Sequence, residues 1–196
     1  RKMGKSYNNV IKLTELFSGD HPILEKAYHP MTVRFFILQT HYRSTLDFSN
    51  EALQASEKGL KRLWDAYEKL GNLSMDDSQQ AIDAELDNRI RKLIAEFDEF
   101  MNDDFSTAKV LANMFEIVPV INSMKDKIIP VSSLSKETFE LLQNSFKTWL
   151  EDIFGLKSVT EADNAKLQGV MQLLIDIRKE AKSRKDFATS DKIRNQ

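Results

Sequence analysis

Cysteine is absent from the sequence, and glycine and proline are scarce, with 6 and 4 copies in 196 residues. The lack of cysteine excludes a disulfide framework and a thiolate zinc site, and it is consistent with a reducing compartment. Such a small number of turn-forming residues argues against a many-stranded sheet. No run of about 18 apolar residues occurs, and the first residues are charged, so the sequence predicts neither a membrane span nor a signal peptide.

The composition is that of a helical protein with a sizeable core. Charged residues make up 30% of the chain and hydrophobic residues 41%, and a chain of this length buries roughly 70% of its unfolded surface on folding. The formal net charge is −2, so any contact with nucleic acid has to come from a local basic patch. The chain opens on Arg1 and closes on Gln196 inside a helical pattern, and we therefore expect a piece of a longer protein.

Apolar residues that recur every three or four positions predict a series of amphipathic helices. Ser49 and Ser135 are suited to cap helix N-termini, and Gly71 and Gly155 to end helices. The clearest runs extend from Ser49 to Gly71, from about Ser78 to Met101, from Ser106 or Thr107 through Ile121, from Ser135 to Phe154, and from about Asp163 to Arg184.

Other segments are less regular. The apolar stretch between Met31 and His41 favours a helix, with a buried strand as the alternative. Asp20 is placed to cap a short helix that has Pro22 in its first turn, and Pro119 should kink the helix that contains it. The whole pattern predicts an all-α fold, an antiparallel bundle of long amphipathic helices preceded by a short connective region.

The first candidate for chemistry is the run Lys2-Met3-Gly4-Lys5-Ser6. It places two ammonium groups, a flexible glycine and a hydroxyl on one short loop. Such a loop can grip the phosphates of ATP while negative charge moves onto a departing pyrophosphate. A basic terminus exposed to solvent is the alternative interpretation.

The acidic and histidine residues do not predict a metal site. His21, His29 and His41 lack a spacing such as His-x-x-x-His, so zinc binding is not expected. The pair Asp103-Asp104 is better explained as a helix-ending turn with solvated carboxylates. A Gly-rich strand-to-helix loop, a nucleophile elbow and a Ser–His–acid triad are all missing, so the chain by itself is not expected to hold a complete active site.

Two further regions are basic. Arg34 lies upstream of His41, Tyr42 and Arg43, and a second group of cations lies near the end of the chain. Seven cations against three carboxylates give this stretch a local net charge of +4. It can neutralise RNA phosphates and release counterions, or it can be a solvated helix face. The cations are Arg178, Lys179, Lys182, Arg184, Lys185, Lys192 and Arg194.

Four motifs, in order along nearly the whole chain, resemble a known family. Lys2 to Ser6 is similar to the Lys-Met-Ser-Lys-Ser signature of class I aminoacyl-tRNA synthetases, and Asn8-Asn9-Val10-Ile11 resembles the stretch that follows it there. The other three resemble segments of cysteinyl-tRNA synthetases. They are Arg34–Leu38 leading into His41–Ser49, Met101–Thr107, and Leu174–Arg178 with Ala181, Arg184–Ala188 and Asp191.

The resemblance implies the C-terminal half of a cysteine–tRNA ligase. In this family an upstream Rossmann-type domain binds ATP, cysteine and zinc, and the zinc ligands lie outside this chain. The resemblance implies that Lys5 stabilises the pyrophosphate charge, that Lys2 supports it, and that Ser6 offers a hydroxyl. Met3 and Gly4 would complete this ATP-binding loop, where Gly4 stands in place of the family's first serine. ATP with Mg²⁺ would be the substrate.

The resemblance also implies a domain order and partners. Residues 1–8 would be the remnant of the ATP loop, 9–48 a connective region that contacts the tRNA stem, and 49–196 an anticodon-binding bundle truncated at its C-terminal end. We expect a cytoplasmic monomer that binds cysteine tRNA, ATP and cysteine, without contact to a membrane. A stand-alone helical module for RNA binding or protein interaction is the alternative. The candidate tRNA contacts are Arg34, Arg43, Arg178, Lys182, Arg184 and Lys185.

Overall fold

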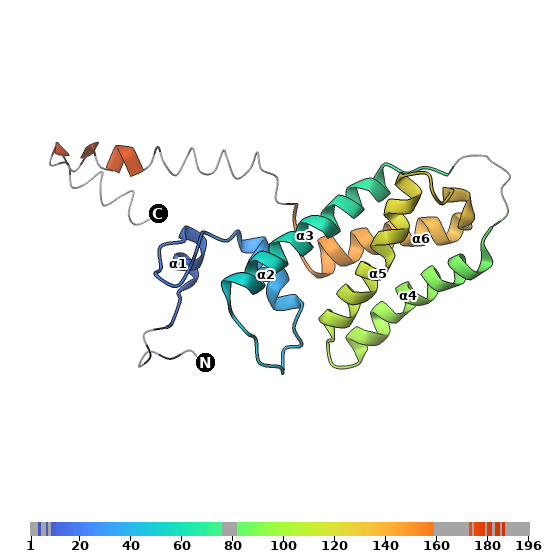
Figure 1. Ribbon diagram of the computed structural model, residues 1–196, viewed down its shortest axis with the longest axis horizontal. Coiled ribbons are helices and arrows are strands. Elements are labelled where there is room, and N and C mark those ends of the chain that lie inside the picture. The colour runs from blue at the N-terminus through green and yellow to red at the C-terminus, as the bar shows by residue number, and fades with distance from the viewer. Residues whose placement is uncertain are drawn as a thin grey trace. The chain divides into compact units, whose positions relative to one another are not determined.

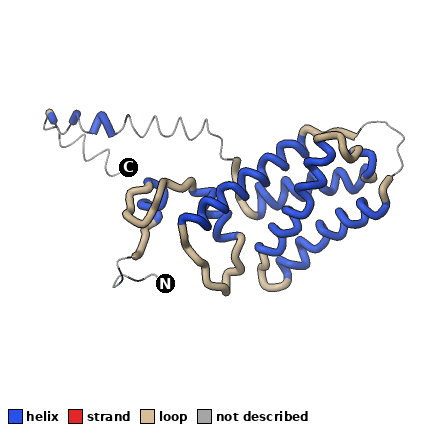
Figure 2. The backbone as a smooth tube through the Cα atoms, in the orientation of Figure 1, coloured by secondary structure: helices blue, strands red, loops and turns tan. Residues whose placement is uncertain are grey.

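A computed structural model describes residues 4, 7, 9–75, 82–158, 173, 175–178, 180, 181, 183, 184 and 186. The chain divides into two compact units, 1–158 and 159–196. The described part contains helices and no strand (Figures 1 and 2), so the all-α prediction is confirmed. The elements in chain order are α1 (Leu13–Ser18), α2 (Pro30–Leu38), α3 (Asn50–Gly71), α4 (Ala84–Asn102), α5 (Thr107–Lys125), the 3₁₀ helix η2 (Val131–Ser133), α6 (Lys136–Lys147) and the π-helix η3 (Thr148–Ile153).

The four long helices of the first unit form one bundle. α5 packs against both α3 and α4, α6 packs against α3 and α4, and α2 lies on α3 (Figure 1). Aromatic side chains fill the interior: Phe97 and Phe154 each contact the Trp149 ring edge-on, at centroid distances of 5.5 and 5.8 Å. Phe146 is completely buried. The apolar faces expected from the helical period are therefore the faces that meet in the core.

A smaller apolar cluster holds the N-terminal segment against α2 and α3. Leu16 of α1 and Tyr28 of the following loop are buried with Val33, Phe36 and Leu53. The Tyr28 hydroxyl donates to the Asn50 carbonyl at 3.3 Å, so its polar end is satisfied at the start of α3. This cluster therefore attaches α1 and the loop after it to α2 and α3.

The helix boundaries follow from local hydrogen bonds. The Ser49 hydroxyl accepts from the Ala52 amide at 3.2 Å, and the Ser135 hydroxyl accepts from the Thr138 amide at 3.2 Å. Both predicted caps are confirmed, as is the helix between Met31 and His41, whose first residue is Pro30. Gly155 has a φ of 58°, the left-handed conformation that glycine adopts without strain.

Two sequence-based expectations about helix starts are wrong. No helix begins at Asp20, because residues 20–29 form a loop and the next helix starts at Pro30. α4 starts at Ala84 and not near Ser78, since the Asp83 carboxylate accepts from the Glu85 and Leu86 amides at 3.1 and 3.0 Å.

Ser106 does precede α5, but its side chain makes no capping hydrogen bond. α5 itself continues through Pro119. Most of the predicted helix from Asp163 to Arg184 lies outside the described residues.

Asp87 joins α4 to the start of α6, and its ionised form should stabilise the fold. Burial alone would raise the pKa of this carboxyl, but hydrogen bonds from the Ser135 amide at 2.8 Å, from Thr138 and from Arg91 at 3.1 Å lower it to about 2. A folded-state pKa below the ordinary 3.8 gives stability that is present above pH 4 and lost as the pH falls from 4 to 2.

We expect Asp87→Asn to reduce the free energy of unfolding by about 2 kcal/mol at pH 6, and by much less near pH 2. Urea unfolding at both pH values measures the difference. Asp98→Asn removes an exposed carboxylate of the same helix and should have little effect at either pH. A loss for Asp87→Asn that did not change with pH would contradict this role of the carboxylate.

Candidate functional site

The predicted ATP loop is described only at its centre. The Gly4 amide donates to the Asn9 side chain at 2.9 Å, and the Tyr7 amide donates to the Gly4 carbonyl at 3.0 Å. These bonds close a turn around Gly4. Lys2, Met3, Lys5 and Ser6 lie outside the described residues, so their roles remain predictions.

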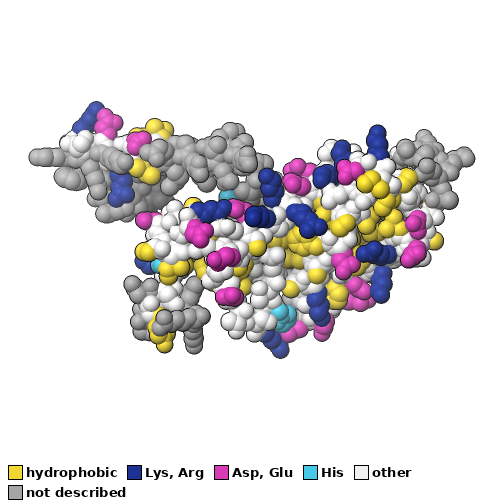
Figure 3. All heavy atoms as spheres, in the orientation of Figure 1, with side chains coloured by type: hydrophobic (Ala, Val, Ile, Leu, Met, Phe, Trp, Pro, Cys, Tyr) yellow, Lys and Arg dark blue, Asp and Glu magenta, His cyan; other side chains and the backbone are white. Residues whose placement is uncertain are grey.

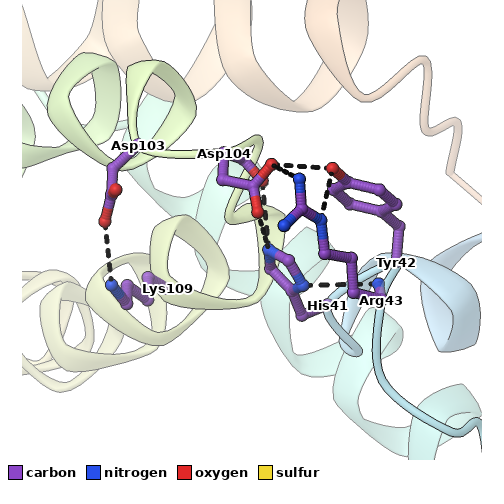
Figure 4. A network of polar contacts seen from close by, with 6 residues as sticks. All are labelled: His41, Tyr42, Arg43, Asp103, Asp104 and Lys109. Atoms are coloured by element: carbon purple, nitrogen blue, oxygen red, sulfur yellow. Dashed lines mark hydrogen bonds and ion pairs between the residues drawn. The ribbon is translucent and has the colours of Figure 1, made fainter.

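A polar network joins the loop after α2 to the turn between α4 and α5 (Figure 4). The Tyr42 hydroxyl donates to Asp104 Oδ1 at 2.7 Å, and Arg43 Nη2 lies 3.2 Å from the same oxygen. His41 Nε2 lies 3.0 Å from the Asp104 carbonyl oxygen and 3.6 Å from Oδ2. Three consecutive side chains of one loop therefore converge on a single aspartate more than 60 residues away.

The turn that presents Asp104 has an unusual backbone. Asp104 and Phe105 have φ angles of 62° and 53°, in the left-handed region that is uncommon for residues with a side chain. The turn is held by the Phe105 amide, which donates to the Met101 carbonyl at 3.0 Å. The Thr107 hydroxyl adds a bond of 2.7 Å to the Leu38 carbonyl at the end of α2.

The expectation of two solvated carboxylates in this turn is wrong for Asp104. Its side chain is 38% exposed and bound on one side by the 41–43 loop. Asp103 fits the expectation: its side chain is 77% exposed, points away from the network in Figure 4, and lies 3.5 Å from Lys109. Two adjacent aspartates thus have different surroundings, because the left-handed turn directs them to different sides.

The network changes the chemistry of its tyrosine. The hydrogen bond to Asp104 raises the pKa of the Tyr42 hydroxyl, although Arg43 acts in the opposite direction. Ionisation of Tyr42 would place a second negative charge beside the carboxylate. Tyr42 is therefore held as a hydrogen-bond donor.

An apolar cleft of about 460 Å³ lies beside the network. Tyr42 and Phe105 are 63% and 66% exposed at its rim. The lining residues are Ile37, Leu38, Thr40, Tyr42, Phe105 and Thr107.

The predicted basic contacts fall into different environments. Arg34 makes an intramolecular hydrogen bond: its Nε donates to the Phe154 carbonyl at 2.6 Å and links α2 to the end of η3. Arg43 is part of the network, with a side chain 69% exposed. Arg178 is half-buried and Arg184 pairs with Glu180. Lys182 and Lys185 lie outside the described residues.

The sequence-based reasoning missed one group of cations on α3. Lys58, Lys61 and Arg62 are exposed, and none forms an ion pair with a carboxylate of the described residues. Arg62 lies over the Phe115 ring at 5.7 Å. Figure 3 shows basic side chains over α3 beside an apolar area toward α5. Their spacing of three and four residues, which places them on one helix face, was the available signal.

The cations of α4 differ from those of α3. Arg91 and Lys92 pair with Asp87 and Glu96 one turn away, and Arg89 pairs with Glu116 of α5. Lys58, Lys61 and Arg62 therefore differ from the α4 cations, because they have no carboxylate partner among the described residues and remain available to an external anion.

The described residues contain neither a membrane-spanning helix nor a cluster of metal-ligating side chains. None of the helices among them is both long and apolar enough to cross a membrane. Within the same residues, no three His, Cys, Asp or Glu side chains come together as a possible metal site.

Comparison with known proteins finds two family matches along the chain. Residues 1–58 match the family described as tRNA synthetases class I (C) catalytic domain, and residues 96–158 match the DALR domain. The loop 41–43 thus lies in the first matched span and Asp104 in the second.

Similar proteins cover the whole chain. It is 46% identical to a cysteine–tRNA ligase of Parabacteroides distasonis and 43% identical to one of Porphyromonas gingivalis, in both cases over 100% of the chain. A cysteine–tRNA ligase of Cytophaga hutchinsonii is 41% identical over 99% of the chain. The chain spans 38 to 39% of the length of these relatives.

Proposed function

Because the chain is similar to cysteine–tRNA ligases over essentially its whole length, we propose that it is part of such an enzyme, which activates cysteine with ATP and transfers it to cysteine tRNA. The observation that carries this proposal is an identity of 37 to 46% to enzymes of that name, extending over essentially the whole chain. The match to a catalytic domain at residues 1–58 favours the ligase over a stand-alone helical module.

In this proposal the first residues serve the activation step. Lys5 stabilises the charge that develops on pyrophosphate as cysteine attacks ATP, Lys2 supports it, and Ser6 donates a hydrogen bond. Gly4 gives the loop the conformational freedom to close around the phosphates, because it carries no side chain. Mg²⁺ accompanies ATP as substrate, and the family's zinc ion is held outside this chain.

The helices serve the tRNA. We assign residues 1–8 to the ATP loop, 9–48 to the connective region and 49–196 to the tRNA-binding bundle, in a cytoplasmic monomer. Lys58, Lys61 and Arg62 have no carboxylate partner among the described residues, and they support a phosphate-binding face on α3. An ammonium or guanidinium group of this kind can bind a phosphate without first breaking an ion pair. Among the earlier candidates, the exposed Arg43 and the C-terminal cations Arg178, Lys182, Arg184 and Lys185 remain proposed contacts.

The test is the activity of the intact ligase that contains this chain. We expect cysteine, and not serine, to support ATP–pyrophosphate exchange, and cysteine to be attached to a cysteine tRNA transcript in an ATP-dependent reaction. The serine reaction and an omission of tRNA are the controls. Exchange with neither amino acid, or equal exchange with both, would contradict the proposed function.

A further inference from the structure

Asp104 connects two parts of the chain that match different domains. The residues that bind it, His41, Tyr42 and Arg43, lie within the span that matches a catalytic domain, and Asp104 lies within the span that matches a DALR domain. This carboxylate is thus one of the direct polar links between the two matched spans, beside the bonds from Thr107 to the Leu38 carbonyl and from Arg34 to the Phe154 carbonyl. It is the one that gathers three side chains of the other span.

The link is specific in geometry. A hydrogen bond of 2.7 Å from Tyr42 and an ion pair of 3.2 Å with Arg43 meet at Asp104 Oδ1, while His41 Nε2 lies 3.0 Å from the backbone carbonyl of the same residue. The Arg43 Nε also donates to the Tyr42 hydroxyl at 2.9 Å, so the two loop residues fix one another. Such a set of directional contacts restricts rotation as well as separation.

The strained backbone around Asp104 supports a functional role for its contacts with the 41–43 loop. Two consecutive residues with side chains occupy the left-handed region, where strain is maintained only when neighbouring contacts enforce it. Asp103 and Lys109 lie on the other side of the turn and are largely exposed (Figure 4). The strained turn therefore presents Asp104, and not Asp103, to the 41–43 loop.

We propose that Asp104 is a positioning residue that fixes the orientation of the tRNA-binding bundle relative to the catalytic domain. This inference rests on the proposed function. Cysteine activation takes place within the catalytic domain and does not need tRNA. Transfer to tRNA requires that a molecule held by the bundle place its distant 3′ end at the activated cysteine. A small rotation at the joint moves that end by a distance that grows with the length of the tRNA, and a misplacement of about 1 Å can lower a rate about 100-fold.

The two reactions of the intact ligase separate this role from a merely structural one. For Asp104→Asn and Asp104→Ala we expect kcat/KM for charging of a cysteine tRNA transcript to fall at least tenfold, with cysteine-dependent ATP–pyrophosphate exchange within twofold of wild type. Asparagine tolerates the left-handed backbone and can still accept from Tyr42, so its effect should be the smaller one. Asp103→Asn is the matched control and should leave both reactions unchanged.

A second variant tests the same link from its other side. Tyr42→Phe removes the hydrogen bond and keeps the aromatic ring, so it should also reduce charging selectively. Its effect should not add to that of Asp104→Ala, because both variants remove the hydrogen bond between Tyr42 and Asp104.

Parallel loss of exchange and charging, or charging at the wild-type rate in Asp104→Asn and Tyr42→Phe, would overturn the proposal. An Asp104→Ala protein that fails to fold leaves the two conservative variants as the deciding ones. Wild-type protein without cysteine-dependent exchange would instead refute the proposed function.

Discussion

Lys5→Ala in the intact ligase is expected to slow cysteine-dependent ATP–pyrophosphate exchange at least tenfold. The lysine is proposed to contact charge that is present on pyrophosphate mainly in the transition state. Removal of one such preorganised contact costs about 3–4 kcal/mol, which corresponds to a decrease of about 100- to 1,000-fold in rate. The effect should appear in kcat more than in the KM for cysteine, because cysteine binding does not involve this charge.

Two further variants define the role of the charge. Lys5→Arg keeps a positive charge in a bulkier group and should retain more activity than the alanine variant. Lys12→Ala is the control, since Lys12 is an exposed lysine near the loop that pairs with Glu15 at 3.5 Å. A wild-type exchange rate for Lys5→Ala would remove Lys5 from the mechanism.

The triple replacement of Lys58, Lys61 and Arg62 by glutamine should weaken tRNA binding about 100-fold at 0.1 M salt. Three phosphate contacts contribute about 0.7 each to the slope of log affinity against log salt for single strands. Their combined contribution relative to 1 M salt is then about two orders of magnitude in affinity at 0.1 M. Binding of a cysteine tRNA transcript to this chain, titrated at several salt concentrations, measures both the affinity and the slope.

The matched control removes the same charge from cations that are already paired. Arg89, Lys92 and Lys136 lie near Glu116, Glu96 and Glu140, at 3.4, 4.0 and 3.9 Å. Their replacement by glutamine should change the salt slope much less. Equal losses in the two triple variants would assign the effect to the overall charge and not to the face of α3.

Local signals in the sequence were sufficient for most of the bundle. Ser49 and Ser135 cap the helices that they were expected to cap, because an N-cap depends on residues within one turn of the cap itself. The start of α4 was placed too early because the apolar period includes Ile82, whereas Asp83 supplies the cap that fixes the first turn. Periodicity indicates which face is buried more reliably than where the helix begins.

Contacts between distant segments could not be predicted in the same way. The resemblance identified His41–Ser49 and Met101–Thr107 as separate motifs, but nothing in their spacing indicates that Tyr42 reaches Asp104. The sequence also did not indicate which basic residues form ion pairs. Arg89 is paired only because α5 brings Glu116 beside it, and such a pairing depends on how the helices pack.

Arg34 and Gly155 illustrate a constraint on how this fold can change over evolutionary time. Arg34 donates to the Phe154 carbonyl, and a β-carbon at position 155 would lie 2.9 Å from its guanidinium. Position 155 also requires a left-handed backbone, so a larger residue there meets two penalties at once. A lineage that replaced Arg34 would therefore relieve only the steric penalty at position 155 and would still inherit the conformational demand on the glycine.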